Sequence, residues 1–311
     1  MEIAVLIPCY NEELTIKKVI NDFQKYLPTA TIYVYDNNSK DQTAAIALAE
    51  GAIVKREREQ GKGNVVRSMF RDIEADIYVM IDGDDTYPVE EINKLIVPVV
   101  EGYADMVIGD RLSNGTYYAE NKRGFHAFGN KLVLGLINKI FHSNINDIMT
   151  GYRVFSKKFV KNVPVMSKGF QIETEFSIFS LEHRMKIVEI PITYRDRPEG
   201  SESKLNTFSD GFKVLIALFD LVKDYRPLFF FSLIGLFLTI LGLCVGIPVI
   251  NEFIATHYIS KVPSAILAVG LVLTAILNFI LGLILDHQTN IYKQQYEMQV
   301  NNFIYFDNKR K

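Results

Sequence analysis

The most regular hydrophobic pattern in the chain is a pair of long apolar runs near its C-terminal end. Residues 228–250 and 262–285 contain no Asp, Glu, Lys or Arg. An α-helix rises about 1.5 Å per residue and the hydrocarbon core of a bilayer is about 30 Å thick, so each run is long enough to cross it. A buried helix of a soluble protein is rarely this long without a charge. The pattern therefore predicts two transmembrane helices.

Short β-rich runs alternate with helical patterns in the first third of the chain. Strands are expected at 3–7, 31–35, 52–54, 77–81 and 106–108, and helices at 12–26, 41–49, 64–73 and 89–100. This alternation predicts an α/β fold with a mostly parallel sheet and helices on both faces. Ligands of such sheets bind at the carboxyl ends of the strands, and the polar clusters of this region fall there.

The pattern is looser after residue 121. Helices are expected at 125–141 and 170–183, a strand at 186–194 and a polar loop at 195–205. Residues 207–223 have apolar positions at helical spacing with Lys213 and Lys223 among them, which is typical of a helix on a membrane surface or of one docked on a globular domain. The expected organisation is a catalytic domain, a juxtamembrane helix, a two-helix membrane region and a tail, at 1–205, 206–227, 228–286 and 287–311.

The distribution of charge predicts how the chain crosses the membrane. The net charge of −2 and the lack of a basic low-complexity tail give no indication of nucleic acid as a partner. The first residues have no basic segment before a long apolar run, so no signal peptide is expected. Positive residues flank the two spans on the side of both termini, at Lys204, Lys213, Lys223, Arg226, Lys309, Arg310 and Lys311. The chain is therefore expected to be a multi-pass protein of the cytoplasmic (inner) membrane with both termini in the cytoplasm. Cys9 and Cys244 are not expected to pair.

The sequence Asp82-Gly83-Asp84-Asp85 directly follows the apolar strand at 77–81. Carboxylates this close repel one another unless they share a cation. Asp82 and Asp84 alternate along an extended segment, so both can point to the same side. Ligands that offer only oxygen suit Mg²⁺ or Mn²⁺. An acidic surface turn is the alternative.

Polar segments also follow the first two strands, at 8–12 and 36–39. A nucleotide can lie across such an edge, and Asp36 can accept hydrogen bonds from a ribose or a base. Asn11 can equally cap the following helix. The triplet Gly61-Lys62-Gly63 opens a helix with free N–H groups and a cation, which favours phosphate, although it lacks the spacing of a P-loop.

Taken in order along the chain, these motifs resemble family 2 inverting glycosyltransferases with the GT-A fold. The resemblance is closest to the polyprenol-phosphate branch, the dolichol- and undecaprenyl-phosphate sugar synthases, and the two spans are similar to those of bacterial members that use undecaprenyl phosphate. It rests on Pro8, Asn11-Glu12, Asp36, Gly61-Lys62-Gly63, Asp82-X-Asp84, Gly109-Asp110-Arg111 and Asp147…Thr150-Gly151-Tyr152-Arg153.

The resemblance implies a role for each of these residues. Asp82 and Asp84 would hold Mg²⁺ or Mn²⁺ against the donor diphosphate. The nucleotide sugar would contact Pro8, Tyr10, Asn11, Glu12, Asp36, Lys62 and Asp82. Arg111, Arg123 and Arg153 would line the acceptor side, and Asp147 would be the catalytic base. Independently of the resemblance, Lys204 closes the charge-rich segment 195–204 and can reach a lipid phosphate, with a plain linker as the alternative. Many relatives have Gln two residues after the second metal-binding Asp, where this chain has Thr86.

Elementary chemistry argues against Asp147 as a base. A phosphate monoester has a second pKa of about 6, so the acceptor is largely deprotonated at neutral pH, and its charge repels a carboxylate. We therefore expect Asp147 to orient Arg153 or the sugar. Glu173 and Glu175 stand at a helix start, where carboxylates favour the helix dipole, and a role in sugar binding is the alternative.

The expected reaction transfers a hexose or N-acetylhexosamine from a nucleotide diphosphate sugar to undecaprenyl phosphate with inversion, for use in cell-envelope glycans. UDP-glucose and UDP-GlcNAc are the favoured donors, and the alternatives are GDP-mannose or a non-catalytic scaffold that binds nucleotide sugar. A processive synthase is disfavoured because the chain has only two spans and no tryptophan. Gly242 and Gly246 have the spacing of a helix-pairing motif, so a dimer or tetramer is plausible.

Overall fold

The computed structural model describes residues 1–113, 115, 124–169, 171–195, 219–220 and 222–310. The chain divides into two compact units, Met1–Thr207 with Phe303–Lys311, and Phe208–Asn302. Arg123 and Lys204, two residues expected on the acceptor side, lie outside the described residues, as does most of the predicted helix at 207–223.

The first unit is built on one seven-stranded sheet with the strand order β3-β2-β1-β4-β6-β5-β7. The strands are β1 (Ile3–Cys9), β2 (Thr31–Asp36), β3 (Ile53–Arg56), β4 (Ile77–Met80), β5 (Met106–Asp110), β6 (Arg153–Ser156) and β7 (Ile187–Pro191). All pairs are parallel except those of β6, which runs antiparallel to both β4 and β5. The predicted α/β fold with a mostly parallel sheet is confirmed.

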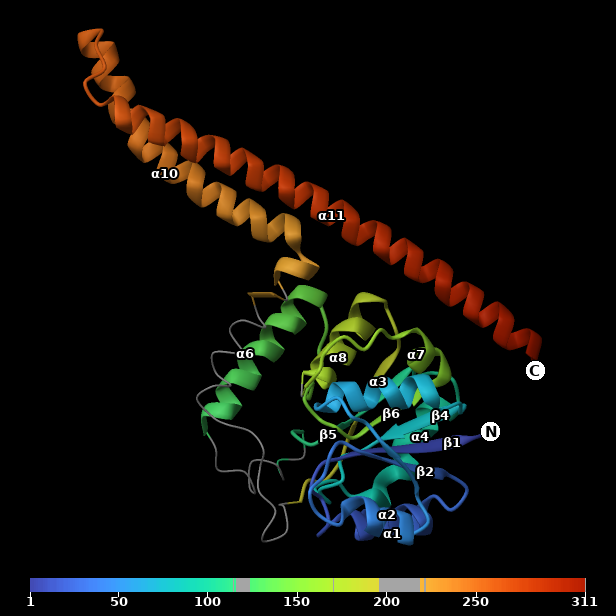
Figure 1. Cartoon of the computed structure of the whole chain (residues 1–311). Coiled ribbons are helices and arrows are strands. Elements are labelled where there is room, and N and C mark those ends of the chain that lie inside the picture. Colours follow the sequence, from blue (N-terminus) through green and yellow to red (C-terminus); the bar gives the residue numbers. More distant parts are fainter. Residues whose placement is uncertain (114, 116–123, 170, 196–218, 221, 311) are drawn as a thin grey trace. The chain divides into compact units, whose positions relative to one another are not determined.

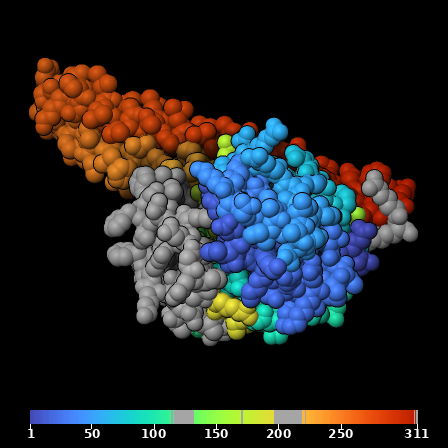
Figure 2. Space-filling view, turned by 60° about the horizontal axis from the view of Figure 1, so that its bottom comes forward, coloured from blue at the N-terminus to red at the C-terminus, as the bar shows by residue number. Residues whose placement is uncertain are grey.

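Helices cover both faces of the sheet (Figure 1). The described helices up to residue 195 are α1 (Ile16–Tyr26), α2 (Thr43–Ala49), α3 (Lys62–Asp72), α4 (Ile92–Val100), α6 (Gly124–Phe141), α7 (Lys157–Asn162) and α8 (Ile172–Glu182), with a short 3₁₀ turn η1 (Val89–Glu91) before α4. Figure 1 shows α1 and α2 on one side of the strands and α3, α7 and α8 on the other. In Figure 2 the blue N-terminal elements form the face turned toward the viewer.

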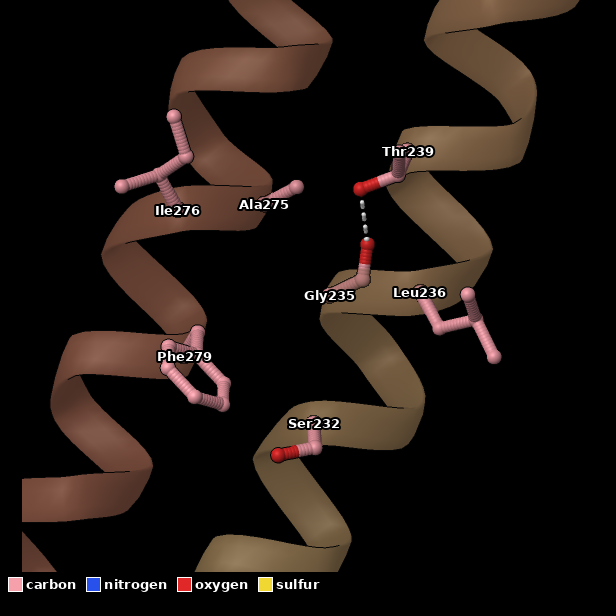
Figure 3. Close-up of a pocket in the computed structure, with 7 residues that line it drawn as sticks. All are labelled: Ser232, Gly235, Leu236, Thr239, Ala275, Ile276 and Phe279. Carbon is pink, nitrogen blue, oxygen red and sulfur yellow. Dashed lines mark hydrogen bonds between the residues drawn. The ribbon is translucent and has the colours of Figure 1, made fainter.

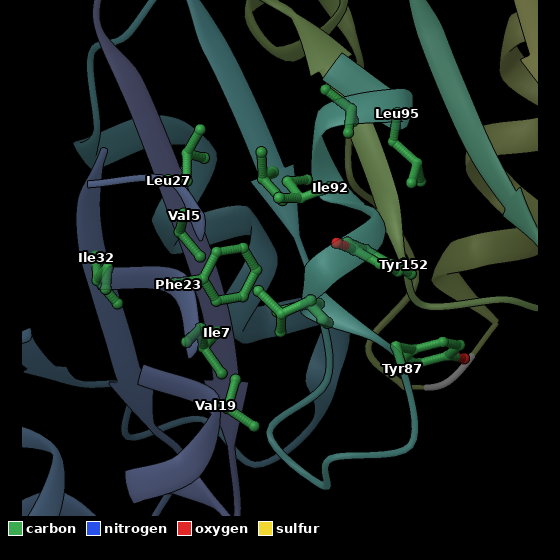
Figure 4. Close-up of a cluster of buried hydrophobic side chains, with 14 of the residues drawn as sticks. Val5, Ile7, Val19, Phe23, Leu27, Ile32, Tyr87, Ile92, Leu95 and Tyr152 are labelled. Carbon is green, nitrogen blue, oxygen red and sulfur yellow. The ribbon is translucent and has the colours of Figure 1, made fainter. Parts of the chain in front are cut away.

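The two faces of the sheet pack against two different sets of side chains. Val5 and Ile7 of β1 belong to the cluster of Figure 4, where Val19 and Phe23 of α1 pack beside them. The opposite face is aromatic, with Phe155 of β6 surrounded by Phe70, Phe159 and Phe176 at ring-centroid distances of 5.7, 4.7 and 5.4 Å. Burial on both faces explains why the strands read as continuous apolar runs.

The second unit contains the two apolar helices, α10 (Pro227–Thr256) and most of α11 (Val262–Arg310). Both are long and apolar enough to cross a membrane by length and composition. The residues of the expected tail at 287–311 continue α11 without a break from the apolar run to Arg310. The division of the chain into domains stays a prediction.

Small residues let α10 and α11 lie close together. A Cβ atom at Gly235 would lie 3.0 Å from the carbonyl oxygen of Ala275, and one at Gly242 would lie 2.9 Å from Val272 Cγ2. A groove of about 240 Å³ lies beside this contact, with Thr239 donating a hydrogen bond to the carbonyl of Gly235 (Figure 3). Gly246 faces Ala268 of the same chain. The glycines that suggested self-association therefore make contacts within one chain, and the oligomeric state stays a prediction.

Candidate active site

The ends of β1, β2 and β4 bring the polar segments of the sequence to one edge of the sheet. The N–H of Asn37 donates to the carbonyl of Cys9 at 2.9 Å, and the N–H of Ile81 donates to the carbonyl of Leu6 at 3.2 Å. The pairing thus continues to the last residue of each strand. The segments at 8–12, 36–39 and 82–85 leave the sheet beside one another, as the sequence predicted.

Asn11 joins the loops that follow β1 and β2. Its backbone has φ +55°, its N–H donates to Ser39 Oγ at 2.9 Å, and its Oδ1 accepts from the N–H of Lys40 at 2.8 Å. The next N–H, of Glu12, donates to Thr43 Oγ1 at 2.8 Å. Asn11 is therefore not a helix cap, since α1 begins only at Ile16. Pro8 and Tyr10 are partly buried on the same strand end.

Asp36 and Asn37 are the buried polar residues directly at the end of β2. Asp36 is buried and its carboxylate accepts from the N–H of Ser39. Asn37 is also buried; its amide donates to the carbonyls of Glu57 and Glu59 and accepts from the N–H of Gly61 at 2.7 Å. Asn37 fixes the loop between β3 and α3. The sequence predicted the polar segment at 36–39 but not this role of Asn37, whose only signal was its place directly after a strand.

Each of the three carboxylates after β4 interacts with a different side chain. Asp85 has φ +57° and pairs with Lys18 at 2.5 Å. Asp84 is buried, and its Oδ1 accepts from Thr86 Oγ1 at 2.7 Å. Asp82 is paired with Lys62. Thr86, which replaces the expected Gln, thus orients the second aspartate through a hydrogen bond.

Lys62 is held between two carboxylates. Its ammonium donates to Asp82 Oδ1 and to Glu173 Oε1, the latter at 2.5 Å, and its side chain is only 8% exposed. Burial alone would lower the pKa of Lys62, but the charges of Asp82 and Glu173 raise it above its ordinary value of 10.5. Lys62 is therefore a permanent cation in this site at neutral pH.

The glycines on either side of Lys62 allow close backbone packing, a role that the sequence did not predict. A Cβ atom at Gly61 would lie 3.1 Å from the carbonyl carbon of Lys168, and one at Gly63 would lie 2.7 Å from that of Ser167. The N–H of Gly63 donates to the carbonyl of Lys168 at 3.1 Å. The N–H of Gly61 is bound by Asn37 and that of Gly63 by Lys168, so the triplet does not offer a set of free N–H groups. Phosphate binding by Lys62 stays a prediction.

Gly151 lies against the carboxylate of Asp82. A Cβ atom at this position would collide with Asp82 Oδ2 and lie 2.9 Å from its Cγ. The N–H of Gly151 donates to the hydroxyl of Tyr87 at 3.0 Å. Burial raises the pKa of Tyr87, and the charges of both Arg111 and Asp82 act on its phenol. The segment at 147–151 and the turn at 82–85 therefore belong to one site.

Arg111 and Asp147 form an ion pair beside this turn. Arg111 Nε donates to Asp147 Oδ2 at 2.9 Å, and Asp147 is 2% exposed. The loop that carries Asp147 is held in turn by Glu189 of β7, whose carboxylate accepts from the N–H groups of Asn146 and Asp147 at 2.9 and 3.0 Å. Burial raises the pKa of Glu189.

Arg153 is not on the surface of the site, which corrects its predicted place on the acceptor side. Its side chain is fully buried on β6. It donates to the carbonyls of Thr150 and Ile148 at 3.0 and 2.8 Å and to Ser177 Oγ at 3.0 Å. Burial lowers the pKa of its guanidinium to about 10. Arg153 thus holds the loop at 148–150 through hydrogen bonds to its carbonyl groups.

The two acids of α8 have separate partners. Glu173 is buried with Lys62, whereas Glu175 accepts from the N–H groups of Met166 and Ser167 at 2.8 and 2.9 Å. Glu175 thus fixes the segment that packs on Gly61 and Gly63. Neither side chain acts only through the helix dipole.

Comparison with known proteins identifies the family. Residues 4–163 match the family described as glycosyl transferase family 2. The glycosyltransferase AglJ of Haloferax volcanii is 31% identical over 294 residues, which cover 94% of this chain and 95% of AglJ. The chain belongs to glycosyl transferase family 2. The dolichyl-phosphate hexose transferase of the same organism is 30% identical over 210 residues, 68% of this chain and 89% of that protein.

A solved structure supports the fold of this family 2 glycosyltransferase. Glucosyl-3-phosphoglycerate synthase from Mycobacterium tuberculosis, in complex with Mn²⁺, UDP-glucose and phosphoglyceric acid, superposes with a TM-score of 0.56 at 20% identity. The match covers 70% of this chain and 79% of that one. The GT-A architecture expected from the sequence is thereby confirmed.

Proposed function

We propose that this glycosyltransferase moves a hexose or N-acetylhexosamine from a nucleotide diphosphate sugar to a polyprenyl phosphate, with undecaprenyl phosphate as the acceptor, and that the anomeric configuration is inverted. The observation that carries the proposal is the turn at 82–84. It presents two carboxylates at the carboxyl ends of the strands, in a chain that also has two helices able to cross a membrane. The similarity to a dolichyl-phosphate hexose transferase supports a lipid phosphate as the acceptor.

The donor set of the turn suits Mg²⁺ or Mn²⁺. Asp82 and Asp84 offer oxygen ligands only, and no group of three or more His, Cys, Asp and Glu side chains able to hold a metal occurs among the described residues. A site with few protein ligands is typical of Mg²⁺, which keeps several waters and binds substrate phosphates. Asp82 and Asp84 would hold the ion, which supplies positive charge beside the leaving diphosphate.

The donor nucleoside would lie on the edge formed by β1 and β2. Asp36 and Asn11 are fixed there by the loops that they join, and Pro8, Tyr10 and Glu12 are on the same strand end. UDP-glucose and UDP-GlcNAc are the first candidates for the donor, and GDP-mannose is the second. Lys62 and Asp82 would lie at the diphosphate end.

The acceptor phosphate would be bound by Arg111, with Arg123 and Lys204 as further candidates. Because this phosphate is already ionised at neutral pH, its oxygen can attack the anomeric carbon without a base. Asp147 pairs with Arg111 and not with Arg153 among its described hydrogen bonds, so the proposed role of Asp147 is to position Arg111. The nucleoside diphosphate leaves as the new bond forms.

The test is transfer of radiolabelled sugar from a panel of UDP- and GDP-sugars to undecaprenyl phosphate in detergent, with and without Mg²⁺ or Mn²⁺. Asp84→Asn is run beside the wild type. We expect one labelled lipid whose formation needs the metal and is lost in the variant. No labelled lipid from any donor, together with retained binding of a nucleotide sugar, would favour the non-catalytic scaffold instead.

A further inference from the structure

Lys62 occupies a place where its charge acts on a carboxylate proposed to hold a metal ion. The ammonium contacts Asp82 on one side and Glu173 on the other, and the side chains of Lys62 and Glu173 are both nearly excluded from solvent. Asp82 is the most exposed of the three, at 26%. The carboxylate that faces solvent thus already has one cation beside it.

The position of Lys62 is fixed from several sides. The backbone of the segment at 167–168 packs on Gly61 and Gly63 and leaves no room for a Cβ atom at either. That segment is itself held by Glu175, which accepts two of its N–H groups. The start of α3 is therefore anchored, and the head of Lys62 is anchored by Glu173. Lys62 cannot leave Asp82 by a movement of its backbone without breaking these contacts.

A divalent cation bound by Asp82 would lie close to the ammonium of Lys62. The two cations would repel each other and would share one carboxylate, so each weakens the attraction of the other for Asp82. The diphosphate of a nucleotide brings negative charge that offsets this repulsion. The balance between Lys62 and the ion then depends on whether the nucleotide is present.

We propose that Lys62 is a positioning residue that competes with the divalent cation for Asp82, so that the cation binds tightly only together with the donor diphosphate. This inference rests on the proposed function, since it takes Asp82 and Asp84 as the metal ligands. Glu173 moderates the competition because it shares the ammonium with Asp82. The site would therefore load metal and nucleotide together.

The experiment measures binding of Mn²⁺ to the purified full chain in detergent, from the electron paramagnetic resonance signal of free Mn²⁺. The probes are Mn²⁺ alone, then Mn²⁺ with UDP and Mn²⁺ with GDP. Lys62→Met removes the charge at similar length, and Lys62→Arg keeps the charge as its matched control. We expect Lys62→Met to bind Mn²⁺ alone about tenfold more tightly than the wild type, and to lose most of the gain that the nucleotide gives. Lys62→Arg keeps the charge beside Asp82 and should bind Mn²⁺ alone about as weakly as the wild type.

Glu173→Gln gives a second, opposite test. Without the charge of Glu173, the ammonium interacts with Asp82 alone, so Mn²⁺ alone should bind more weakly than to the wild type. A role of Lys62 and Glu173 limited to holding the fold predicts weaker binding in both variants. Opposite changes in the two variants therefore support competition for Asp82.

Unchanged or weaker binding of Mn²⁺ alone to folded Lys62→Met would overturn the inference, with folding checked by thermal unfolding. Asp84→Asn separates this failure from a failure of the proposed function. If Asp84→Asn loses Mn²⁺ binding while Lys62→Met binds like the wild type, the metal site stands and the competition does not. If Asp84→Asn binds Mn²⁺ like the wild type, the proposed metal site fails, and the inference fails with it.

Discussion

Arg111 Nε lies 2.9 Å from Asp147 Oδ2, and both side chains are largely withdrawn from solvent. The N–H of Met149 donates to the other oxygen of Asp147 at 3.2 Å. The carboxylate is thus directed at the guanidinium and at its own loop. Removal of either partner leaves the other charge poorly compensated, which is costly in a partly buried place.

We expect Arg111→Gln and Asp147→Asn each to lower the rate of sugar transfer by about 100-fold. The first removes the cation proposed to bind the acceptor phosphate, and the second misplaces that cation, where an error of about 1 Å costs roughly that much. The double variant should be little worse than either single one, since the two residues act as a unit. Rates measured at saturating donor in the four proteins give the coupling.

The pH dependence of Asp147→Asn distinguishes positioning from base catalysis. If Asp147 positions Arg111, the fractional loss of activity should be the same at pH 6 and at pH 8. Recovery of activity as the pH rises would restore Asp147 as a proton acceptor.

Thr86→Val should raise the concentration of Mg²⁺ or Mn²⁺ needed for half-maximal activity by roughly tenfold. The variant loses the hydroxyl that donates to Asp84, and a hydrogen bond to a charged group is worth about 1.5 kcal/mol or more. Thr86→Ser keeps the hydroxyl and is the matched control. Equal metal dependence in the valine variant and the wild type would show that Asp84 does not need this bond.

Gly151→Ala should lower both activity and metal affinity, because the added methyl group displaces the carboxylate of Asp82. Gly135→Ala is the control, since a Cβ atom at Gly135 meets nothing within 4 Å. It should leave activity unchanged and stabilise α6 by up to about 1 kcal/mol. The comparison uses transfer rates and Mn²⁺ binding in the two variants, and normal metal affinity in Gly151→Ala would contradict the close contact with Asp82.

Arg153→Lys should destabilise the protein by about 3 kcal/mol, because lysine cannot satisfy two buried carbonyls and a hydroxyl in the geometry of the guanidinium. Arg111→Lys should cost much less stability, since Arg111 is at the edge of the site. Unfolding of the full chain in detergent measures both. A stable but inactive Arg153→Lys would return Arg153 to a direct role in the reaction.

The hydrogen bonds of Glu91 predict how the stability of the folded protein depends on pH. Burial would raise its pKa, but hydrogen bonds from the N–H and hydroxyl of Thr193 and from Lys94 lower it below its ordinary value of 4.5. A lowered folded-state pKa stabilises the fold above about pH 4.5, and this stabilisation is lost as the pH falls through the folded-state pKa. Glu91→Gln should therefore be less stable than the wild type at pH 7 by under about 1 kcal/mol, with the difference shrinking as the pH falls through the folded-state pKa. A difference that does not shrink as the pH is lowered would contradict it.

The parallel part of the sheet could be predicted because its strands are apolar on both faces and end in polar clusters. β6 could not be predicted in this way. It is a four-residue strand that begins with Arg153, and its direction is decided by its contacts with β4 and β5. The error about Arg153 follows from the same cause, since the motif gives the residue type but not the face to which the side chain points.

In the candidate site, too, some features could be predicted from the sequence and others could not. The turn at 82–85 is local, so its pattern could be recognised from spacing alone. The contact of Lys62 with Glu173 joins residues 111 positions apart, and that of Tyr87 with Gly151 joins residues 64 apart. No spacing in the sequence reports such contacts, and the partners of Lys62 and the use of its flanking glycines were therefore not predicted.

The antiparallel strand β6 also has a consequence for biosynthesis. The chain leaves the ribosome from its N-terminus, and the strands β1 to β4 can pair as soon as they appear, since each is a neighbour of another in that set. Gly151 and Glu173, however, come later along the chain and must fold back onto Asp82 and Lys62. A nascent chain that stops at β5 has the edge formed by β1 and β2 but lacks Gly151, the neighbour of Asp82, and Glu173, the partner of Lys62. We expect the ability to bind a nucleotide sugar to appear late in synthesis, only after α8 has emerged.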